Sequence, residues 1–295
     1  MIESPWLQGR DRYDRTLEGW TDNTHPDAFT HTVRISDGDF GFEVSAVCTP
    51  SPRYEIREAS ARVLDGNPAP GSANRFAGIQ GTRMVGGFAK ALVEAVGSGE
   101  GADLMVAAGM ELARLGRQAT KLPQEATRGL RAGDARRYWE LDNIGWTDLP
   151  NSCFAYRPQT KALFDVRPVT TPMPPEIYAA PIGAEKIFYR KKLIRMVRTG
   201  SRLHLFNSLH DNAHGFDIHY EIDLDSDRIV AVDSIRSRLP YLGICDEPQA
   251  KIAAMNGQRV DGVLRKNIQT MLGGENGCTQ IFDLTSDLLK LLVPV

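Results

Sequence analysis

The sequence predicts an α+β protein in which two β-β-β-α-α repeats, related by internal duplication, form mainly antiparallel sheets. The stretch DGDFGFEV at 37–44 is similar to DNAHGFDI at 211–218. The longer stretch at 79–101 is similar to that at 255–277, in the same order and at nearly the same separation along the chain. Blocks that recur in this way indicate repeated structural units.

In the first repeat, three apolar and β-branched stretches at 28–36, 40–48 and 53–64 predict strands. The first two are separated by the Asp-Gly turn that is typical of hairpins. Apolar residues at helical spacing then predict helices near 79–96 and 102–120, with a glycine-rich break between them.

The second repeat shows the same order. Strands are predicted at 201–210, 215–224 and 227–237, and helices near 249–272 and 277–292. On the strand after the second-repeat turn, alternation predicts one apolar face and one polar face. The apolar face contains Phe216, Ile218, Tyr220 and Ile222, and the polar face contains Asp217, His219, Glu221 and Asp223.

Three regions follow from this pattern. They are an N-terminal repeat at 1–122, a linker at 123–185, and a C-terminal repeat at 186–295 that carries the candidate site. In the linker, a helix is predicted within 126–146, and the proline-rich stretch 170–183 is predicted to be irregular.

The stretch 186–200 alternates apolar and basic residues and predicts an additional strand. Its basic residues are Arg190, Lys191, Lys192, Arg195 and Arg198. Such a run occurs in nucleic-acid-binding proteins, but few aromatic residues are interleaved with it, and the chain as a whole is slightly acidic. We interpret the run as a solvated strand face.

Composition excludes several classes of protein. The chain has 35 basic and 37 acidic residues, which gives no general attraction to nucleic acid or to an anionic membrane. No stretch is long and apolar enough to span a bilayer, and the N-terminus does not resemble a secretory signal. The four cysteines lie far apart without CxxC spacing. We therefore expect a cytoplasmic protein with free thiols.

Three of the six histidines, His210, His214 and His219, lie within ten positions of the second repeat. The first repeat has Ser36, Phe40 and Ser45 at the matching positions, so the repeated fold does not require these histidines. The aspartate, glycine and phenylalanine that both copies share have structural explanations: turn initiation, positive φ and core packing.

Three interpretations of this histidine cluster stay open. Metal-free acid–base catalysis would use His210 and His214 as base and acid, with Asp211 orienting them and His219 and Tyr220 completing the site. A metal site for Zn or Fe would use His210, His214 and His219 with Asp211. In the third, the histidines belong to an exposed hairpin and carry no function.

Other residues are candidates for substrate binding. Tyr241 and Cys245 lie in LPYLGICDEPQ, where the thiol is either a nucleophile or a packed side chain. Thr279 and Gln280 begin a helix whose N-terminus could hold an anion or simply be capped. Tyr156, together with Tyr138, Trp139 and Trp146, could line an aromatic pocket or pack in the core. Since nucleotide and nicotinamide motifs are absent, we expect no cofactor.

The second repeat resembles a bacterial domain family of unknown function. The resemblance covers about residues 186–292 and rests on three stretches: HDNAHGFDIHYEIDLDSDRIVAV, RLPYLGICDEP and VDGVLRKNIQTMLGGENGCTQIFDL. The family's closing signature reads Gly-Cys-Thr-His. Here Gly277, Cys278 and Thr279 match, whereas Gln280 replaces the histidine. If that histidine is functional in relatives, its role here is altered or has moved, for example to His214.

The chain also resembles the γ-formaldehyde lyases of aromatic-degrading bacteria. That resemblance implies a cofactor-independent lyase that releases formaldehyde from a lignin-derived diaryl compound, with Arg238 helping to hold the substrate. The expected partner is a small aromatic molecule, without nucleic acid or membrane, and both a monomer and a homodimer stay open. The alternatives are a metal-dependent hydrolase or lyase and a noncatalytic ligand-binding protein.

Overall fold

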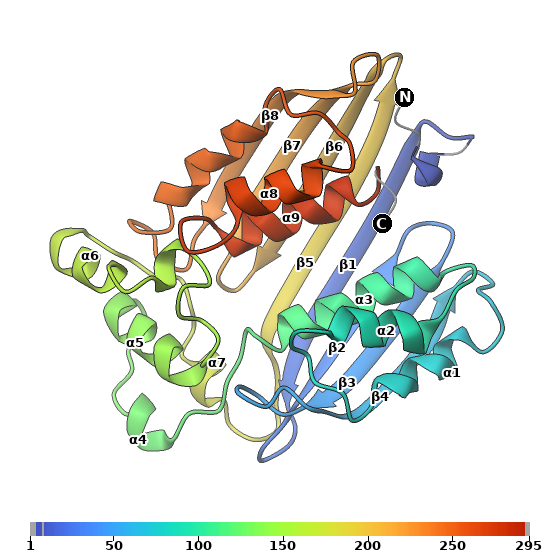
Figure 1. The fold of residues 1–295 in the computed structure, drawn as a ribbon. Coiled ribbons are helices and arrows are strands. Elements are labelled where there is room, and N and C mark those ends of the chain that lie inside the picture. The colour runs from blue at the N-terminus through green and yellow to red at the C-terminus, as the bar shows by residue number, and fades with distance from the viewer. Residues whose placement is uncertain (1–3, 8, 293–295) are drawn as a thin grey trace.

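The computed structural model describes residues 4–7 and 9–292, and within them the fold is built on one antiparallel sheet. The sheet has eight strands in the order β4-β3-β2-β1-β5-β6-β7-β8 (Figure 1). The strands are β1 (Arg12–Asn23), β2 (Phe29–Ser36), β3 (Gly41–Cys48), β4 (Ile56–Asp65), β5 (Ala184–Thr199), β6 (Arg202–Asp211), β7 (Gly215–Asp223) and β8 (Arg228–Arg238). Pairing of β1 with β5 makes the sheet continuous across the two halves.

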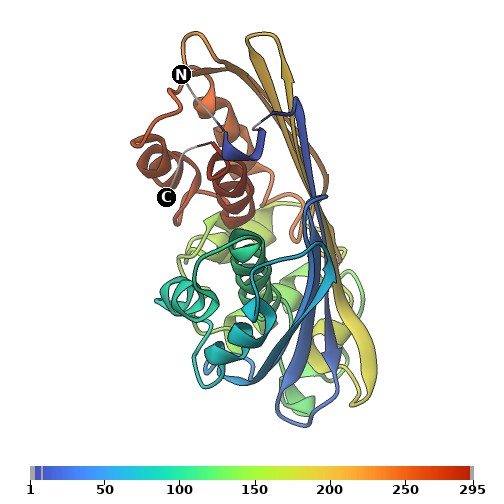
Figure 2. The same cartoon turned by 90° about the vertical axis from the view of Figure 1, so that its right-hand side faces the viewer.

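The main helices of both halves lie on the same face of the sheet (Figures 1 and 2). The first half has α1 (Ser72–Phe76), η2 (Ala77–Ile79), α2 (Phe88–Val96) and α3 (Ala102–Leu115), preceded at the N-terminus by η1 (Pro5–Leu7). The second half has η4 (Glu247–Met255), α8 (Leu264–Leu272) and α9 (Thr279–Leu289). We call the face that these helices cover the inner face and the opposite one the outer face.

The linker forms short helices that gather beside one end of the sheet (Figure 1). They are α4 (Gln124–Thr127), α5 (Ala135–Gly145), η3 (Phe154–Tyr156), α6 (Thr160–Val166) and α7 (Glu176–Ala179). Among the described residues, no helix combines the length and the apolar composition needed to cross a membrane.

The two halves share an order of four strands, a 3₁₀ segment and two helices. Gly81 and Gly257, which match in the repeat, both have a φ of 80°. Each donates its backbone N–H over 2.8 Å, Gly81 to the carbonyl of Ile56 and Gly257 to that of Ile229. A positive φ explains why glycine occupies both positions. This common geometry supports internal duplication, which stays a prediction.

The predicted strands are present, including the additional strand at 186–200, which is β5. Each half therefore has four strands, one more than the repeat unit predicted from sequence. The sequence prediction missed β1, although β1 lies in the middle of the sheet. Its inward positions carry Tyr13, Arg15, Gly19 and Thr21 rather than a run of aliphatic residues, so the usual alternation of apolar and polar residues is weak.

The predicted helices are shorter than expected. The stretch 79–96 is helical mainly over α2, and 249–272 divides into η4 and α8. Within 126–146, only α5 forms a helix of more than four residues. Turns around glycines interrupt the apolar pattern in the first two stretches, and Gly87, with a φ of 90°, directly precedes α2.

The two large apolar clusters pack on the inner face, one in each half. The cluster of the first half includes Phe42, Leu92 and Leu112 and extends into the linker aromatics. That of the second half includes Ile218, Tyr220 and Leu284. The predicted alternation on β7 is confirmed, because Phe216, Ile218, Tyr220 and Ile222 are all buried.

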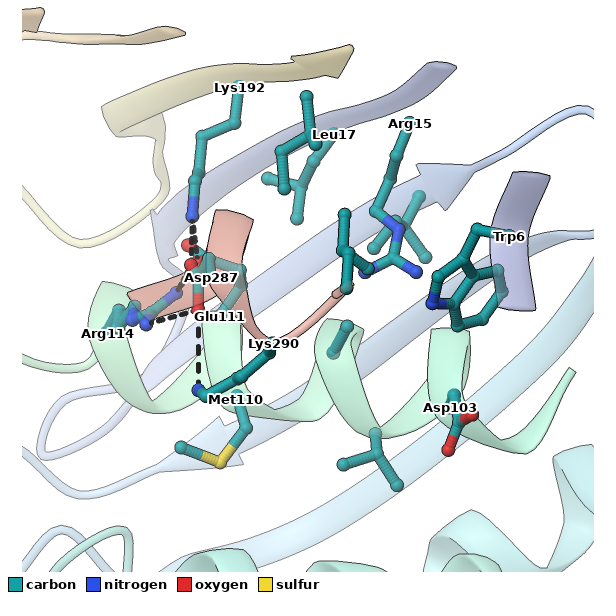
Figure 3. Close-up of a pocket in the computed structure, with 15 residues that line it drawn as sticks. Trp6, Arg15, Leu17, Asp103, Met110, Glu111, Arg114, Lys192, Asp287 and Lys290 are labelled. Carbon is teal, nitrogen blue, oxygen red and sulfur yellow. Dashed lines mark hydrogen bonds and ion pairs between the residues drawn. The ribbon is translucent and has the colours of Figure 1, made fainter. Parts of the chain in front are cut away.

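A network of buried charges lies where the two halves meet. We call it the seam network; it consists of Glu111, Arg114, Arg190, Lys192, Asp211 and Asp287. These residues come from α3, β5, β6 and α9, so the network links both halves. Figure 3 shows four of its members, Glu111, Arg114, Lys192 and Asp287, joined to one another.

The contacts within the seam network are short. Lys192 Nζ lies 2.7 Å from Glu111 Oε1 and 2.9 Å from Asp287 Oδ2. Arg190 Nη2 donates to Asp211 Oδ2 over 2.7 Å. Three cationic and three acidic side chains balance one another, which satisfies the requirement that buried charges be paired.

The expectation of a solvated basic strand is therefore wrong for two of its five basic residues. Arg190 and Lys192 are buried on the inner face, whereas Lys191 and Arg198 are exposed and Arg195 is half-buried. Strand alternation places successive residues on opposite faces, and helices carrying carboxylates cover one of those faces.

We predict that Arg190→Met lowers the free energy of unfolding by about 3–5 kcal/mol, because it leaves buried Asp211 without its cation. Urea denaturation followed by circular dichroism measures the change. Lys191→Met is the matched control, since Lys191 is exposed on the outer face and should leave the unfolding midpoint unchanged. Equal midpoints for the wild type and Arg190→Met would show that the seam network does not stabilise the fold.

Candidate functional site

A cavity of about 270 Å³ lies where the linker meets the β6–β7 hairpin and the start of α9. Six of the residues proposed from sequence line it: Tyr156, His214, Tyr241, Cys245, Thr279 and Gln280. They come from four separate parts of the chain. The fold thus brings together residues that sequence alone could only name individually.

His214 is the histidine of the predicted cluster that reaches this cavity. It precedes β7, its side chain is 12% exposed, and its ring stacks on Phe216 with 6.1 Å between ring centroids. Its Nδ1 lies 3.1 Å from Asp211 Oδ1. When Nδ1–H donates to this carboxylate, the other ring nitrogen, Nε2, is left as a proton acceptor.

Asp211 is fixed by more than His214. Its Oδ1 accepts from the backbone N–H groups of Ala213 at 2.8 Å and His214 at 2.6 Å, as predicted for an aspartate that initiates a turn. Its Oδ2 accepts from Arg190. Although burial opposes ionisation, the interactions with His214 and with the Arg190 guanidinium hold the pKa of Asp211 well below its usual range. Asp211 is therefore a carboxylate at neutral pH and links His214 to the seam network.

Asp142, on α5, is a second buried carboxyl group on the cavity wall. Tyr156 donates its hydroxyl to Asp142 Oδ2 over 2.7 Å, Tyr178 donates to Oδ1 over 2.6 Å, and Tyr241 also donates to Oδ2. Burial raises the pKa of Asp142 to about 6, and the three phenolic donors oppose that rise. A carboxyl group with such a pKa can hold or release a proton near neutral pH.

Aromatic and sulfur-containing side chains form much of the remaining wall. Trp146 and Tyr156 line the cavity, whereas Tyr138 and Trp139 are buried in the adjoining apolar cluster. Cys153, Cys245 and Cys278 also line it. Burial raises the pKa of all three thiols, to about 12 for Cys153. Cys245 is thus a neutral packed thiol in this state, which disfavours the nucleophile interpretation.

Sequence reasoning missed Gln249, although it ends the stretch LPYLGICDEPQ. The residue is fully buried, lines the cavity, and donates its Nε2 to the carbonyl of Cys245 over 2.9 Å. Its Oε1 has no hydrogen-bond partner among the described residues. A buried acceptor without a partner is costly unless a ligand or water supplies a donor. The sequence gives no indication that Gln249 is buried, because glutamine is usually found on protein surfaces.

Asp142 was also missed, although it lies within the stretch GDARRYWELDNIGW that sequence reasoning used. An acidic residue among aromatic residues at helical spacing was the pattern that could have identified it.

Thr279 donates its hydroxyl to the carbonyl of Ser152 over 3.3 Å and so ties the start of α9 to the linker.

His210 and His219 do not join His214. His210 alternates with Asp211 on β6, so its side chain points to the outer face, where its Nε2 lies 3.1 Å from Asp217 Oδ1. His219 stacks on His204 on the same outer face, with 5.5 Å between ring centroids. The structure thus separates His210 and His214, which the sequence analysis paired as base and acid. Adjacent strand positions project in opposite directions, and His214 contacts Asp211 on the other side of the sheet from His210.

Two proposed substrate-binding residues also lie elsewhere. Tyr220 is fully buried in the second apolar cluster, and its hydroxyl is 2.8 Å from Thr285 Oγ1. Arg238 donates its Nη1 to the backbone carbonyl of Asp211 and braces the hairpin turn. Both support the site from outside the cavity.

The proposed metal ligands do not form a ligand set in this arrangement. His210 and His219 lie on the outer face and His214 on the inner face. Within residues 4–7 and 9–292, no three His, Cys, Asp or Glu side chains are grouped so as to hold a metal ion. The residues present therefore do not fit the Zn or Fe alternative, and no step is assigned to a metal.

Comparison with known proteins identifies one family model. Residues 198–293 match a family described as "Protein of unknown function (DUF2889)", which covers β6 to α9 but not the linker. No curated protein and no solved structure matches the chain significantly. The match supports the expected resemblance to a domain family of unknown function.

We predict that the stability of the protein depends on pH through Asp142. Because the pKa of this carboxyl is raised to about 6 in the folded state, the folded protein holds the proton more tightly than the unfolded chain. The free energy of unfolding therefore falls as pH rises from about 4 to about 6, by on the order of 3 kcal/mol, and then levels off.

The comparison of wild type with Asp142→Asn measures this effect. The difference between their free energies of unfolding, followed by urea denaturation from pH 4 to 8, should change through this window and be constant above it. Parallel curves over the whole range would contradict the raised pKa.

Proposed function

We propose that the protein is a cofactor-independent lyase that acts on an aromatic substrate, with His214 as the general base. The observation that carries the proposal is the His214–Asp211 hydrogen bond at the wall of an aromatic cavity. A carboxylate that holds one ring nitrogen of a histidine fixes the ring and leaves the other nitrogen to take a proton.

The reaction is the cleavage of a terminal hydroxymethyl group as formaldehyde. His214 Nε2 removes the proton of the primary alcohol, and the oxygen forms the carbonyl of formaldehyde. The adjacent C–C bond breaks, and its electron pair forms the new C=C bond of a stilbene. The benzylic C–O bond breaks at the same time, and its oxygen leaves with a proton. Substrate and products are at the same oxidation level, so the balance requires no oxidant or reductant.

Asp142 is the group suited to supply the proton for the leaving oxygen. Its pKa of about 6 lies near neutrality, and it lines the same cavity as His214. Two titratable groups held at different proton affinities by their surroundings are the usual basis of acid–base catalysis. This assignment replaces His210, which faces away from the cavity.

Substrate binding would depend on the remaining wall. Trp146 and Tyr156 provide aromatic surface, and Gln249 Oε1 can accept a hydrogen bond from a substrate hydroxyl. A volume of about 270 Å³ is slightly below the usual range for small-molecule sites, so the cavity suits a diaryl substrate without large substituents.

We predict that His214→Ala lowers kcat for formaldehyde release from a 1,2-diarylpropane-1,3-diol by about 10²-fold or more. Formaldehyde is measured by derivatisation, and the stilbene by its ultraviolet absorbance. His204→Ala is the matched control, since it removes an imidazole from the outer face.

Three results would contradict the proposal. Near-wild-type turnover by His214→Ala would exclude His214 as the base. An equal loss of kcat in His210→Ala would show that catalysis does not depend on a histidine at the cavity wall. Tight binding of the diol without formation of formaldehyde or stilbene would favour the noncatalytic ligand-binding alternative.

A further inference from the structure

A second, larger cavity of about 580 Å³ lies on the inner face between α3 and α9, where β1 and β5 pair (Figure 3). Its apolar wall is mainly aliphatic and includes Leu17, Ile35, Val106, Met110 and Ile194. The cavity is thus separate from the one that His214 lines, and none of the proposed catalytic residues contributes to it.

The charges that line this cavity do not balance. Four are cationic, Arg15, Arg114, Lys192 and Lys290, and three are acidic, Asp103, Glu111 and Asp287. Arg114, Lys192 and Lys290 all pair with Asp287, and the first two also pair with Glu111. Asp103 is exposed at the start of α3. Arg114 also pairs with Asp283. Each of these three cations thus has a carboxylate partner, whereas Arg15 has none among the described residues.

Arg15 is unusual because it is buried without an ion-pair partner among the described residues. Its exposed fraction is 9%. Nε donates to the hydroxyl of Tyr13 over 2.9 Å, and that hydroxyl in turn donates to Asp37 over 3.1 Å. Nη2 is buried and has no hydrogen-bond partner within the part of the chain that the structure describes. Leaving a buried charged donor unsatisfied is costly, so an acceptor that enters the cavity would recover that free energy.

Aromatic rings hold the guanidinium in place. Its Cζ lies 5.1 Å from the ring centroid of Trp6 and 5.6 Å from that of Tyr13. Figure 3 shows the side chain extending from β1 toward the helices, beside Trp6. An arginine fixed in this way presents a planar pair of donors, which matches the two oxygens of a carboxylate.

We propose that this cavity binds an amphipathic carboxylate. The carboxylate accepts hydrogen bonds from Arg15, and its apolar body lies along Leu17, Ile35, Val106, Met110 and Ile194. At the other end of the cavity, the charges around Lys192 and Glu111 already pair with one another, so the ligand needs no charged group there. The site is independent of the proposed lyase activity.

Isothermal titration calorimetry with sodium decanoate on the full chain tests the proposal. Saturable binding with one site is expected for the wild type, and 1-decanol, which lacks the charge, should bind at least tenfold more weakly. Arg15→Met keeps the apolar stem and removes the charge, so it should weaken decanoate binding at least tenfold. Arg15→Lys should retain part of the affinity.

Two further variants make the test specific. Arg12→Met removes an arginine of the same strand that pairs with Asp14 on the outer face, and it should bind decanoate as the wild type does. Ala107→Trp fills the cavity without changing its charge and should abolish binding, which gives a second test if Arg15→Met does not fold.

Unchanged affinity in either Arg15→Met or Ala107→Trp would overturn the proposal, because decanoate would then be bound elsewhere. Equal affinity of the wild type for decanoate and 1-decanol would also overturn it, since the guanidinium would play no part. Failure of the wild type to bind decanoate at millimolar concentration would exclude the site.

Discussion

The buried ion pairs between Arg190, Lys192 and the carboxylates that face them constrain the rest of the structure. They join β5 to Glu111 on α3, to Asp211 on β6 and to Asp287 on α9. Charges in such a position are tolerated only when every partner is present. The positions of α3, β6 and α9 are therefore coupled to one another through these contacts.

The same constraint reaches the candidate site. Asp211 belongs to the seam network through Arg190 and orients His214 through its other oxygen. The imidazole is thus held by a carboxylate that is itself fixed by a buried guanidinium and by two backbone N–H groups of the turn. Support of this kind from a second layer of residues keeps a reactive group in one orientation.

The two cavities differ in how their polar groups are satisfied. Around His214, the carboxyl groups of Asp142 and Asp211 are surrounded by donors. Among the described residues of this wall, the groups left open include the Gln249 side-chain oxygen and Trp146 Nε1. Between α3 and α9, the buried carboxyl groups of Glu111 and Asp287 form ion pairs, and a guanidinium nitrogen of Arg15 is left open. The first arrangement suits proton transfer and the second suits recognition of an anion.

The sequence by itself determined the features that depend on neighbours along the chain. Alternation fixed the two faces of β7, and the Asp211 turn chemistry was predicted together with its backbone hydrogen bonds. Residues such as His214, Tyr241 and Thr279 were recognised as candidates, though not as neighbours. Only the tertiary structure decided that β1 is central, that Arg190 and Lys192 are buried, and that His210 points away from His214 toward the outer face. The physical reason is that a strand pattern defines two faces without saying which one is covered. Which face of the sheet is covered depends on where distant helices pack. Asp142 likewise reaches the site only because α5 packs beside it.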